Sequence, residues 1–218
     1  MNPAAPTGGV DVVFADDSLL VLHKPPGLLA VPGRGADKQD CLSARVQALY
    51  PDALVVHRLD MATSGLMLMA RGAAMQRALS ALFEALQIAK TYVAIVDGLL
   101  AVDPTWQLID LPVWADWEAR PLRRVDPRGQ PSQTRWRCVA HTDGPTPASR
   151  LELQPLTGRS HQLRVHMQAI GHPIQGDALY APPDIAARAS RLLLHARDLA
   201  FMHPQNGTHM AFTAAAGF

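Results

Sequence analysis

Two short apolar runs joined by a polar segment constrain the middle of this chain more than any other feature. Leu54–Val56 leads into the run His57–Gly65 (HRLDMATSG), and Leu66–Ala70 then resumes the apolar character. A short apolar run bounded by turn residues is typical of a buried strand. We therefore expect Asp60 to lie in a loop between two buried elements, where the scaffold fixes its position.

Further strands and helices follow from alternation, apolar periodicity and turn residues. Strands are expected at residues 12–14, 19–22, 91–96, 108–113, 134–140, 151–156, 192–196, 199–202 and 210–213, the last two joined at Asn206-Gly207. Helices are expected between Asp40 and Pro51, from about residue 73 to 86, between Ser160 and Gly171, and at 186–190. Many strands with interspersed helices predict an α+β fold around a largely antiparallel sheet.

The helices carry specific expectations about their ends and faces. Asp40 is expected to cap the first helix. Among the strands, the one at 151–156 is expected to be half-exposed, because its polar and apolar residues alternate. On the third predicted helix Arg164 lies one step from Leu163, so it can leave the core face. The residues expected to face inward are Leu42, Val46 and Leu49, then Ala78, Leu82, Phe83 and Leu86, then Leu163, Met167 and Ile170.

Length and composition limit the class of protein. A chain of 218 residues suits one large domain or two closely packed lobes, and two cysteines far apart in sequence favour reduced thiols. The N-terminus lacks the basic start and apolar core of a signal peptide, and no apolar run approaches the roughly 20 residues that span a bilayer. We expect a cytoplasmic monomer with no membrane association.

The net charge of +1 argues weakly against a nucleic-acid partner, but the local charge is uneven. Residues 99–148 are rich in proline and arginine and contain all four tryptophans. Two interpretations stay open for this stretch: a solvated charged loop, or a loop that grips RNA through phosphate contacts and stacking. The basic side chains that cluster here include Arg120, Arg123 and Arg124.

Four motifs and their order along the chain make it resemble the RluA family of pseudouridine synthases, which isomerise uridine in structured RNA. The run at 57–65 resembles the catalytic motif of that family. The other three are Lys24–Leu28 (KPPGL), Lys90–Ala94 (KTYVA) and Thr157–His166 (TGRSHQLRVH). The resemblance extends from about residue 11 to the end and implies a long mixed sheet in two lobes. We expect a flexible lead at 1–10 and a catalytic domain at 11–218. Many family members carry an S4-type RNA-binding domain at the N-terminus, but the first strand is expected near residue 11, so we expect none here.

The resemblance assigns chemistry to a few residues. It implies that Asp60 is the catalytic carboxylate and that Arg164 is its ion partner, which would keep the carboxylate ionised and fix its direction. It implies that Tyr92 stacks on the flipped uracil and acts as a base late in the reaction, and that Leu194 forms an apolar wall of the uracil pocket. The isomerisation needs no cofactor, metal or redox equivalent.

RNA contacts are implied for a second group of residues. Arg58, beside Asp60, is expected to enter the space that a flipped uridine leaves. Four more residues are expected to contact phosphates or to order the cleft, although a structural role is more typical of His57 and of His166. These four are His57, Arg159, His161 and Gln162.

Within the family, the chain is most similar to a short member that acts on a 23S rRNA hairpin and on tRNA anticodon loops. The similarity lies in the opening segment, in Met61–Gly65 and in Arg191–Ala196. The apolar run Glu84–Ala89 and the C-terminal segment depart from the family pattern and leave the RNA specificity open.

Two other functions compete with this one. An RNA-binding module without catalysis would use the same basic loops. A metal-dependent hydrolase would draw on the nine histidines, but His161 and His166 are five residues apart and no HExxH motif accompanies them.

Overall fold

A computed structural model describes residues 9–115, 118–142, 144 and 146–218 of the chain. The chain forms two compact units. Unit 1 consists of the residues up to Lys90 together with Ala196–Gly217, and unit 2 consists of Thr91–His195 together with Phe218. Most of the predicted N-terminal lead, and Trp117, lie outside the described residues. Within the lead, Val10 is only 1% exposed, so residue 10 already belongs to the packed structure.

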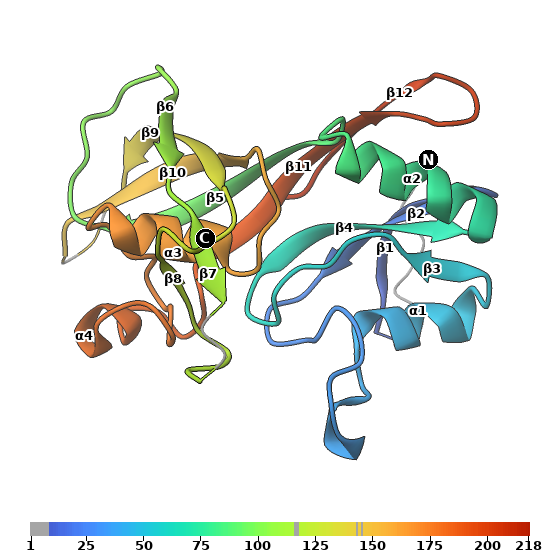
Figure 1. The fold of residues 1–218 in the computed structure, drawn as a ribbon, viewed down its shortest axis with the longest axis horizontal. Coiled ribbons are helices and arrows are strands. Elements are labelled where there is room, and N and C mark those ends of the chain that lie inside the picture. Colours follow the sequence, from blue (N-terminus) through green and yellow to red (C-terminus); the bar gives the residue numbers. More distant parts are fainter. Residues whose placement is uncertain (1–8, 116–117, 143, 145) are drawn as a thin grey trace. The chain divides into compact units, whose positions relative to one another are not determined.

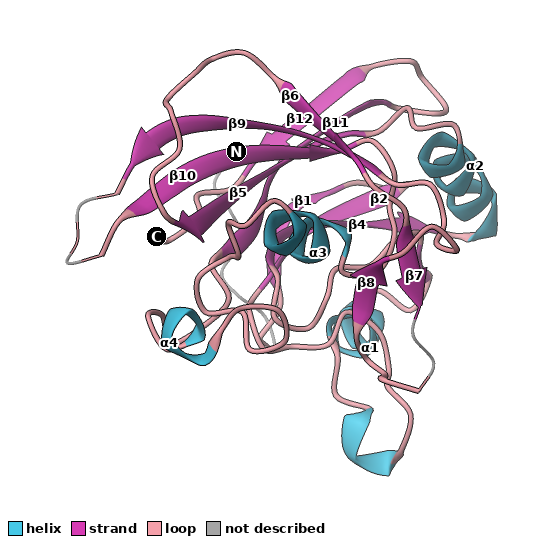
Figure 2. Cartoon of the chain, turned by 60° about the vertical axis from the view of Figure 1, so that its left-hand side comes forward, coloured by secondary structure: helices cyan, strands magenta, loops and turns pink. Residues whose placement is uncertain are grey.

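Strands dominate both units, and the helices are few and short (Figures 1 and 2). The strands are β1 (Asp11–Ala15), β2 (Leu19–Lys24), β3 (Ala53–Val55), β4 (Ser64–Arg71), β5 (Ala89–Asp97), β6 (Gln107–Asp110), β7 (Val113–Ala115), β8 (Arg123–Val125), β9 (Gln133–His141), β10 (Ala148–Pro155), β11 (Leu194–Met202) and β12 (His209–Thr213). The helices are η1 (Ala36–Lys38), α1 (Leu42–Leu49), α2 (Ala73–Glu84), α3 (Gln162–Ala169) and α4 (Pro183–Ala186).

Unit 1 is a sheet with strand order β1-β2-β4-β11, to which β3 and β12 add at β4 and β11. Its core gathers buried side chains such as Leu68, Leu79 and Phe201, contributed by β4, α2 and β11. In Figure 1, α2 lies above β4 and α1 below β3. The completely buried apolar stretch of β4 explains why this strand is central to the unit, because only a strand covered on both faces loses all contact with water.

Unit 2 continues the strand order from the start of β11 through β5, β10 and β9 to β6, and β7 and β8 form a separate two-stranded sheet. The pairs β5/β10, β10/β9 and β9/β6 are antiparallel. The prediction of an α+β fold around a long, mainly antiparallel sheet is therefore confirmed, as is the hairpin at Asn206-Gly207 that joins β11 to β12.

Several helix predictions were wrong in detail. Cys41, not Asp40, is the N-cap of α1, because its sulfur accepts from the Ala44 N–H while the Asp40 carboxylate pairs with Arg45. Leu49 is 40% exposed and Leu86 is 61% exposed, so neither faces a core.

The other helices differ as follows. In α2 the fully buried positions are Met75 and Leu79 rather than Ala78. The short helix expected at 186–190 lies earlier, at Pro183–Ala186. In α3 the first six residues are buried, including Arg164 at 4% exposure, so this arginine is buried although it lies one step from Leu163 on the helix.

The strand predictions needed smaller corrections. Ser64 and Gly65 belong to β4 rather than to the turn before it, and the single strand expected at 108–113 is two strands, β6 and β7. The strand β10 is not half-exposed, because its Glu152 is buried as the ion partner of Arg137 on β9.

Candidate functional site

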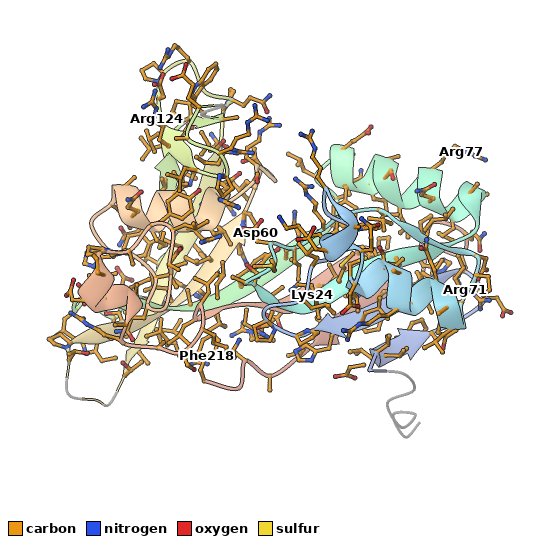
Figure 3. All side chains as sticks on the ribbon, turned by 90° about the horizontal axis from the view of Figure 1, so that it is seen from below. Lys24, Asp60, Arg71, Arg77, Arg124 and Phe218 are labelled. Carbon is orange, nitrogen blue, oxygen red and sulfur yellow. The ribbon has the colours of Figure 1, made fainter. Side chains whose placement is uncertain are left out.

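Asp60 lies in the loop between β3 and β4, as the sequence predicts (Figure 3). The preceding Leu59 is 6% exposed and anchors the loop in the protein interior, whereas Asp60 itself is half-buried and Arg58 is exposed. The Thr63 N–H donates to the Asp60 carbonyl oxygen at 3.1 Å, which closes a turn directly after the aspartate. The loop therefore presents a carboxylate and a guanidinium from a fixed backbone.

Gly65, two residues after this turn, packs closely against a neighbouring strand. Gly65 has a φ of +116°, and a Cβ atom placed there would lie 2.2 Å from the Ala196 carbonyl oxygen on β11. Only glycine fits such an approach without strain. The end of the Asp60 loop is thus locked against β11 within unit 1.

The loop is also tied to the corner at Lys24–Leu28. The Lys24 ammonium is fully buried and donates to three carbonyl oxygens, those of Pro25, Leu28 and Met61, at 2.8, 2.8 and 3.0 Å. Burial lowers the pKa of Lys24 to about 8, and the negative charge of Asp60 acts in the opposite direction. The two prolines make this segment a rigid corner, and its lysine supports the Asp60 loop.

His57 has structural contacts. Its Nε2 accepts a hydrogen bond from the Leu68 N–H at 2.9 Å, and its ring packs on Phe83 with a centroid distance of 4.5 Å. Burial, assisted by the nearby Lys90 charge, lowers the pKa of His57 to about 3, so the ring is neutral at physiological pH. These contacts favour the structural role, and the phosphate contact stays a prediction.

Arg164 lies on α3 in unit 2 and pairs with Asp177. Its Nε donates to Oδ2 at 2.7 Å and its Nη2 donates to Oδ1 at 2.5 Å. The Tyr180 ring lies 4.9 Å from the guanidinium carbon. A guanidinium has five N–H donors, so this pair is compatible with a second carboxylate partner.

The other predicted residues at the start of α3 are ordered by local contacts. His161, the N-cap residue with φ +59°, lies 2.6 Å from the Tyr180 hydroxyl through Nδ1. Gln162 is 3% exposed; its amide donates to Gln133 and Thr134 and accepts from Thr157 and from the Arg159 N–H. Of the two roles considered for Gln162, these contacts support ordering of the loop, which leaves the Arg159 side chain exposed.

His166, expected to be structural, is fully buried and makes two hydrogen bonds, to the Thr134 hydroxyl and to the Leu111 carbonyl oxygen, each at 2.9 Å.

Tyr92 is half-buried on β5, opposite Leu153 of β10. Leu194, at the start of β11, is 3% exposed, as an apolar pocket wall or a core leucine would be.

Within the basic stretch 99–148, β7 and β8 pair as antiparallel strands and form the β7–β8 hairpin. Arg120 and Arg124 are exposed, and Arg124 lies 3.6 Å from the Asp126 carboxylate. Arg123 is half-buried, and its Nη1 donates to the Leu122 carbonyl oxygen at 2.9 Å. Hydrogen bonds from Arg128 hold the pKa of Asp126 far below its usual range. The hairpin thus presents Arg120 and Arg124 to solvent, while the Arg123 guanidinium also forms a hydrogen bond to the backbone of the residue before it.

The predicted residues fall into two sets. Unit 1 holds His57, Arg58 and Asp60; unit 2 holds Tyr92, Arg120, Arg123, Arg124, Arg159, His161, Gln162, Arg164 and Leu194. Sequence reasoning missed Asp177 and Tyr180, which contact Arg164 directly. Their signal was faint: a carboxylate and an aromatic side chain just after the Gly176 turn.

Among the described residues, no group of three or more His, Cys, Asp and Glu side chains is arranged to hold a metal ion. No helix in the described part of the chain is long and apolar enough to cross a membrane.

Comparison with known proteins agrees with the resemblance seen in the motifs. The profile of the family described as RNA pseudouridylate synthase matches residues 18–169. The chain is 47% identical to the dual-specificity RNA pseudouridine synthase RluA of Yersinia pestis over 208 residues, covering 95% of this chain and 99% of that protein. It is 46% identical to the protein of the same name from Escherichia coli K12, over 95% of this chain and 93% of that protein.

Solved structures agree with this grouping. Human RNA pseudouridylate synthase domain containing 1 superposes with a TM-score of 0.79 at 26% identity, over 99% of this chain and 86% of that one. Human RNA pseudouridylate synthase domain containing 4 gives a TM-score of 0.71 at 25% identity, over 94% and 87%. With the motif at residues 57–65, its sheet and these relatives taken together, the chain belongs to the RluA group of the RNA pseudouridylate synthase family.

Proposed function

We propose that this enzyme isomerises uridine to pseudouridine in structured RNA, with a tRNA anticodon loop and a 23S rRNA hairpin as substrates and Asp60 as the catalytic carboxylate. The observation that carries the proposal is the Asp60 loop: a half-buried carboxylate on a backbone fixed by Leu59 and by the buried Lys24 ammonium. The relatives' name, dual-specificity RNA pseudouridine synthase, supports the pair of substrates.

The reaction breaks the bond between ribose C1′ and uracil N1 and forms a bond between C1′ and C5. The proton on C5 is lost and N1 gains one, so substrate and product have the same composition. A carboxylate can attack the sugar, add to the base or remove a ribose proton, and each route keeps this balance. The protein must also hold the released uracil until it has turned.

Three residues of unit 2 complete the proposed site. Arg164 keeps the Asp60 carboxylate ionised and directed, as a buried guanidinium with several donors can. Tyr92 stacks on the uracil and serves as a base late in the reaction. Leu194 provides an apolar wall of the pocket, which its low exposure permits.

A stacked uridine cannot reach the half-buried Asp60 carboxylate, so the proposal includes base flipping at a cost of a few kcal/mol. Arg58, exposed beside Asp60, fills the space that the base leaves. The exposed Arg120, Arg124 and Arg159 contact phosphates. The catalytic domain spans residues 11–218, and the buried free thiols of Cys41 and Cys138 suit a reducing cytoplasm in which the protein acts as a monomer.

The substrates are tested by incubating the purified protein with unmodified tRNA and 23S rRNA transcripts and mapping pseudouridine by sequencing after chemical labelling. Release of tritium from C5-labelled uridine gives an independent count of turnovers. We expect one modified position in an anticodon loop and one in a 23S hairpin. No pseudouridine in either RNA would contradict the proposal; modification of only one would contradict dual specificity.

A further inference from the structure

We propose that Asp177 and Tyr180 are positioning residues for Arg164: together they fix the plane of its guanidinium and link it to the β7–β8 hairpin. The inference rests on the proposed function, because Arg164 matters only if it acts in that site. All of the contacts that carry it lie within unit 2.

The Asp177 carboxylate is held by its own backbone. Its Oδ1 accepts from the Leu179 N–H at 3.0 Å and from the Tyr180 N–H at 3.2 Å, as a side chain does when it caps a turn. The residue is 1% exposed. The carboxylate therefore has a fixed place whether or not the arginine is present, which makes it an anchor for Arg164.

The turn that carries Asp177 is itself tightly packed. Gly176 has a φ of +74°, and a Cβ atom there would lie 1.8 Å from the Arg191 carbonyl oxygen. The Gln175 carbonyl oxygen accepts from the Leu193 N–H at 3.0 Å, one residue before β11 begins. The anchor is thus built onto the segment that leads to Leu194, the proposed wall of the uracil pocket.

Two parallel bonds to one carboxylate fix a guanidinium in a plane, as a single bond would not. Arg164 makes this bidentate contact through Nε and Nη2 while only 4% exposed. A buried charge that loses its partner is costly, and the side chain then shifts to find another. Without Asp177, we expect Arg164 to leave the orientation that its proposed role requires.

Tyr180 adds a second constraint and a connection. Its ring lies 4.9 Å from the Arg164 guanidinium carbon. Its hydroxyl accepts from the Arg123 N–H on β8 at 2.9 Å and lies 2.6 Å from His161 Nδ1. One side chain therefore contacts the arginine, the N-cap of α3 and the strand that carries Arg123 and Arg124.

The first test uses Asp177→Asn, whose side-chain oxygen can still accept from the two backbone N–H groups while the amide nitrogen cannot accept from Arg164. Single-turnover pseudouridine formation should fall about 100-fold at saturating RNA, because a misplaced reacting group costs about that much. RNA affinity should change less than about threefold. The matched control is Asp184→Asn, which removes an exposed partner of Arg188 in the same unit and should leave the rate unchanged. A folded Asp177→Asn protein with the wild-type rate would overturn the proposal.

A double-mutant cycle separates positioning from general stability. If Asp177 acts through Arg164, then Asp177→Asn combined with Arg164→Lys should be no slower than Arg164→Lys alone. If the two losses multiply, Asp177 acts independently of Arg164 and the inference is wrong. A fully active Arg164→Lys single variant would instead contradict the role of Arg164 in the proposed function, so the two failures are distinguishable.

Tyr180→Phe provides the second variant, because it keeps the ring over Arg164 and removes only the hydroxyl bridge. We expect a rate about 3- to 10-fold lower, the size of a lost hydrogen bond, with unchanged thermal stability relative to the Asp184→Asn control. An unchanged rate would show that the bridge to β8 does not position Arg164.

Discussion

The carbonyl oxygen of Met61, the residue that follows Asp60, accepts a hydrogen bond at 3.0 Å from the fully buried ammonium of Lys24. The same oxygen accepts from the Gly27 N–H at 2.9 Å. The KPPGL corner and the Asp60 loop, more than 30 residues apart along the chain, therefore form one rigid element. Lys24 thus helps to hold the backbone of the proposed catalytic loop in place.

Replacing Lys24 with methionine should separate the corner from the loop. The variant keeps the volume of the side chain but removes the Lys24 donor from three carbonyl oxygens, of which that of Met61 keeps its hydrogen bond from the Gly27 N–H. We expect the free energy of unfolding in urea to fall by about 2–4 kcal/mol, with a lower single-turnover rate in the fraction that is folded. Lys38→Met, at an exposed lysine of the same unit, is the control. Equal unfolding midpoints for the two variants would show that the three Lys24 hydrogen bonds do not stabilise the loop.

The rate of the wild-type enzyme should also depend on pH through Lys24. Because the pKa of Lys24 is lowered to about 8, its ammonium is present below that pH and is lost above it. We expect the single-turnover rate at saturating RNA to decline from pH 8 towards pH 9, and Lys24→Met to lack this decline. A decline of the same size in the variant would assign the titration to another group.

Acid should destabilise the protein through His57. Its pKa in the folded protein is about 3, below the ordinary 6.5, so between these values the unfolded chain binds more protons and stability falls as the pH falls. From pH 7 to 4.5 this group should contribute a loss of about 2 kcal/mol. In His57→Gln, whose side-chain oxygen can accept from the Leu68 N–H, the fall between these two pH values should be smaller by that amount. Parallel unfolding curves for the two proteins would contradict the lowered pKa of His57.

The β7–β8 hairpin should contribute to RNA affinity without sequence preference. Arg124 is exposed on β8, and Arg77 is also exposed, on α2 in the other unit (Figure 3). Arg124→Gln should weaken binding of all substrates and reduce the slope of log affinity against log salt by about 1. Arg77→Gln serves as the charge-matched control. The solvated-loop interpretation predicts the same affinity and slope for both variants.

The sequence was most informative where apolar runs and turn residues agree. The continuous apolar stretch of β4 and the Asn206-Gly207 hairpin were both predictable, because burial on two faces and a tight turn each leave a local pattern. The Asp60 loop followed from its two apolar neighbours. These features depend on residues close together in the chain.

Features that depend on distant residues were not predictable in this way. The sequence indicated that Arg164 can leave the core face of its helix, but nothing in α3 indicates that Asp177 and Tyr180 would contact it. Asp40 had the composition of a helix cap, but Arg45 engages its carboxylate and Cys41 takes the position. In each case a partner decided the outcome, and local propensity could not anticipate it.

The central claim is that Asp60 performs the chemistry, and the most direct measurement compares Asp60→Asn with the wild type in both catalysis and binding. Asp52→Asn, which removes a partly exposed partner of Arg71 in the same unit, is the matched control. We predict that Asp60→Asn lowers the single-turnover rate of pseudouridine formation by about 1,000-fold or more, while the dissociation constant for tRNA stays within about threefold and Asp52→Asn behaves as the wild type. Pseudouridine formed by Asp60→Asn at the wild-type rate would contradict the account.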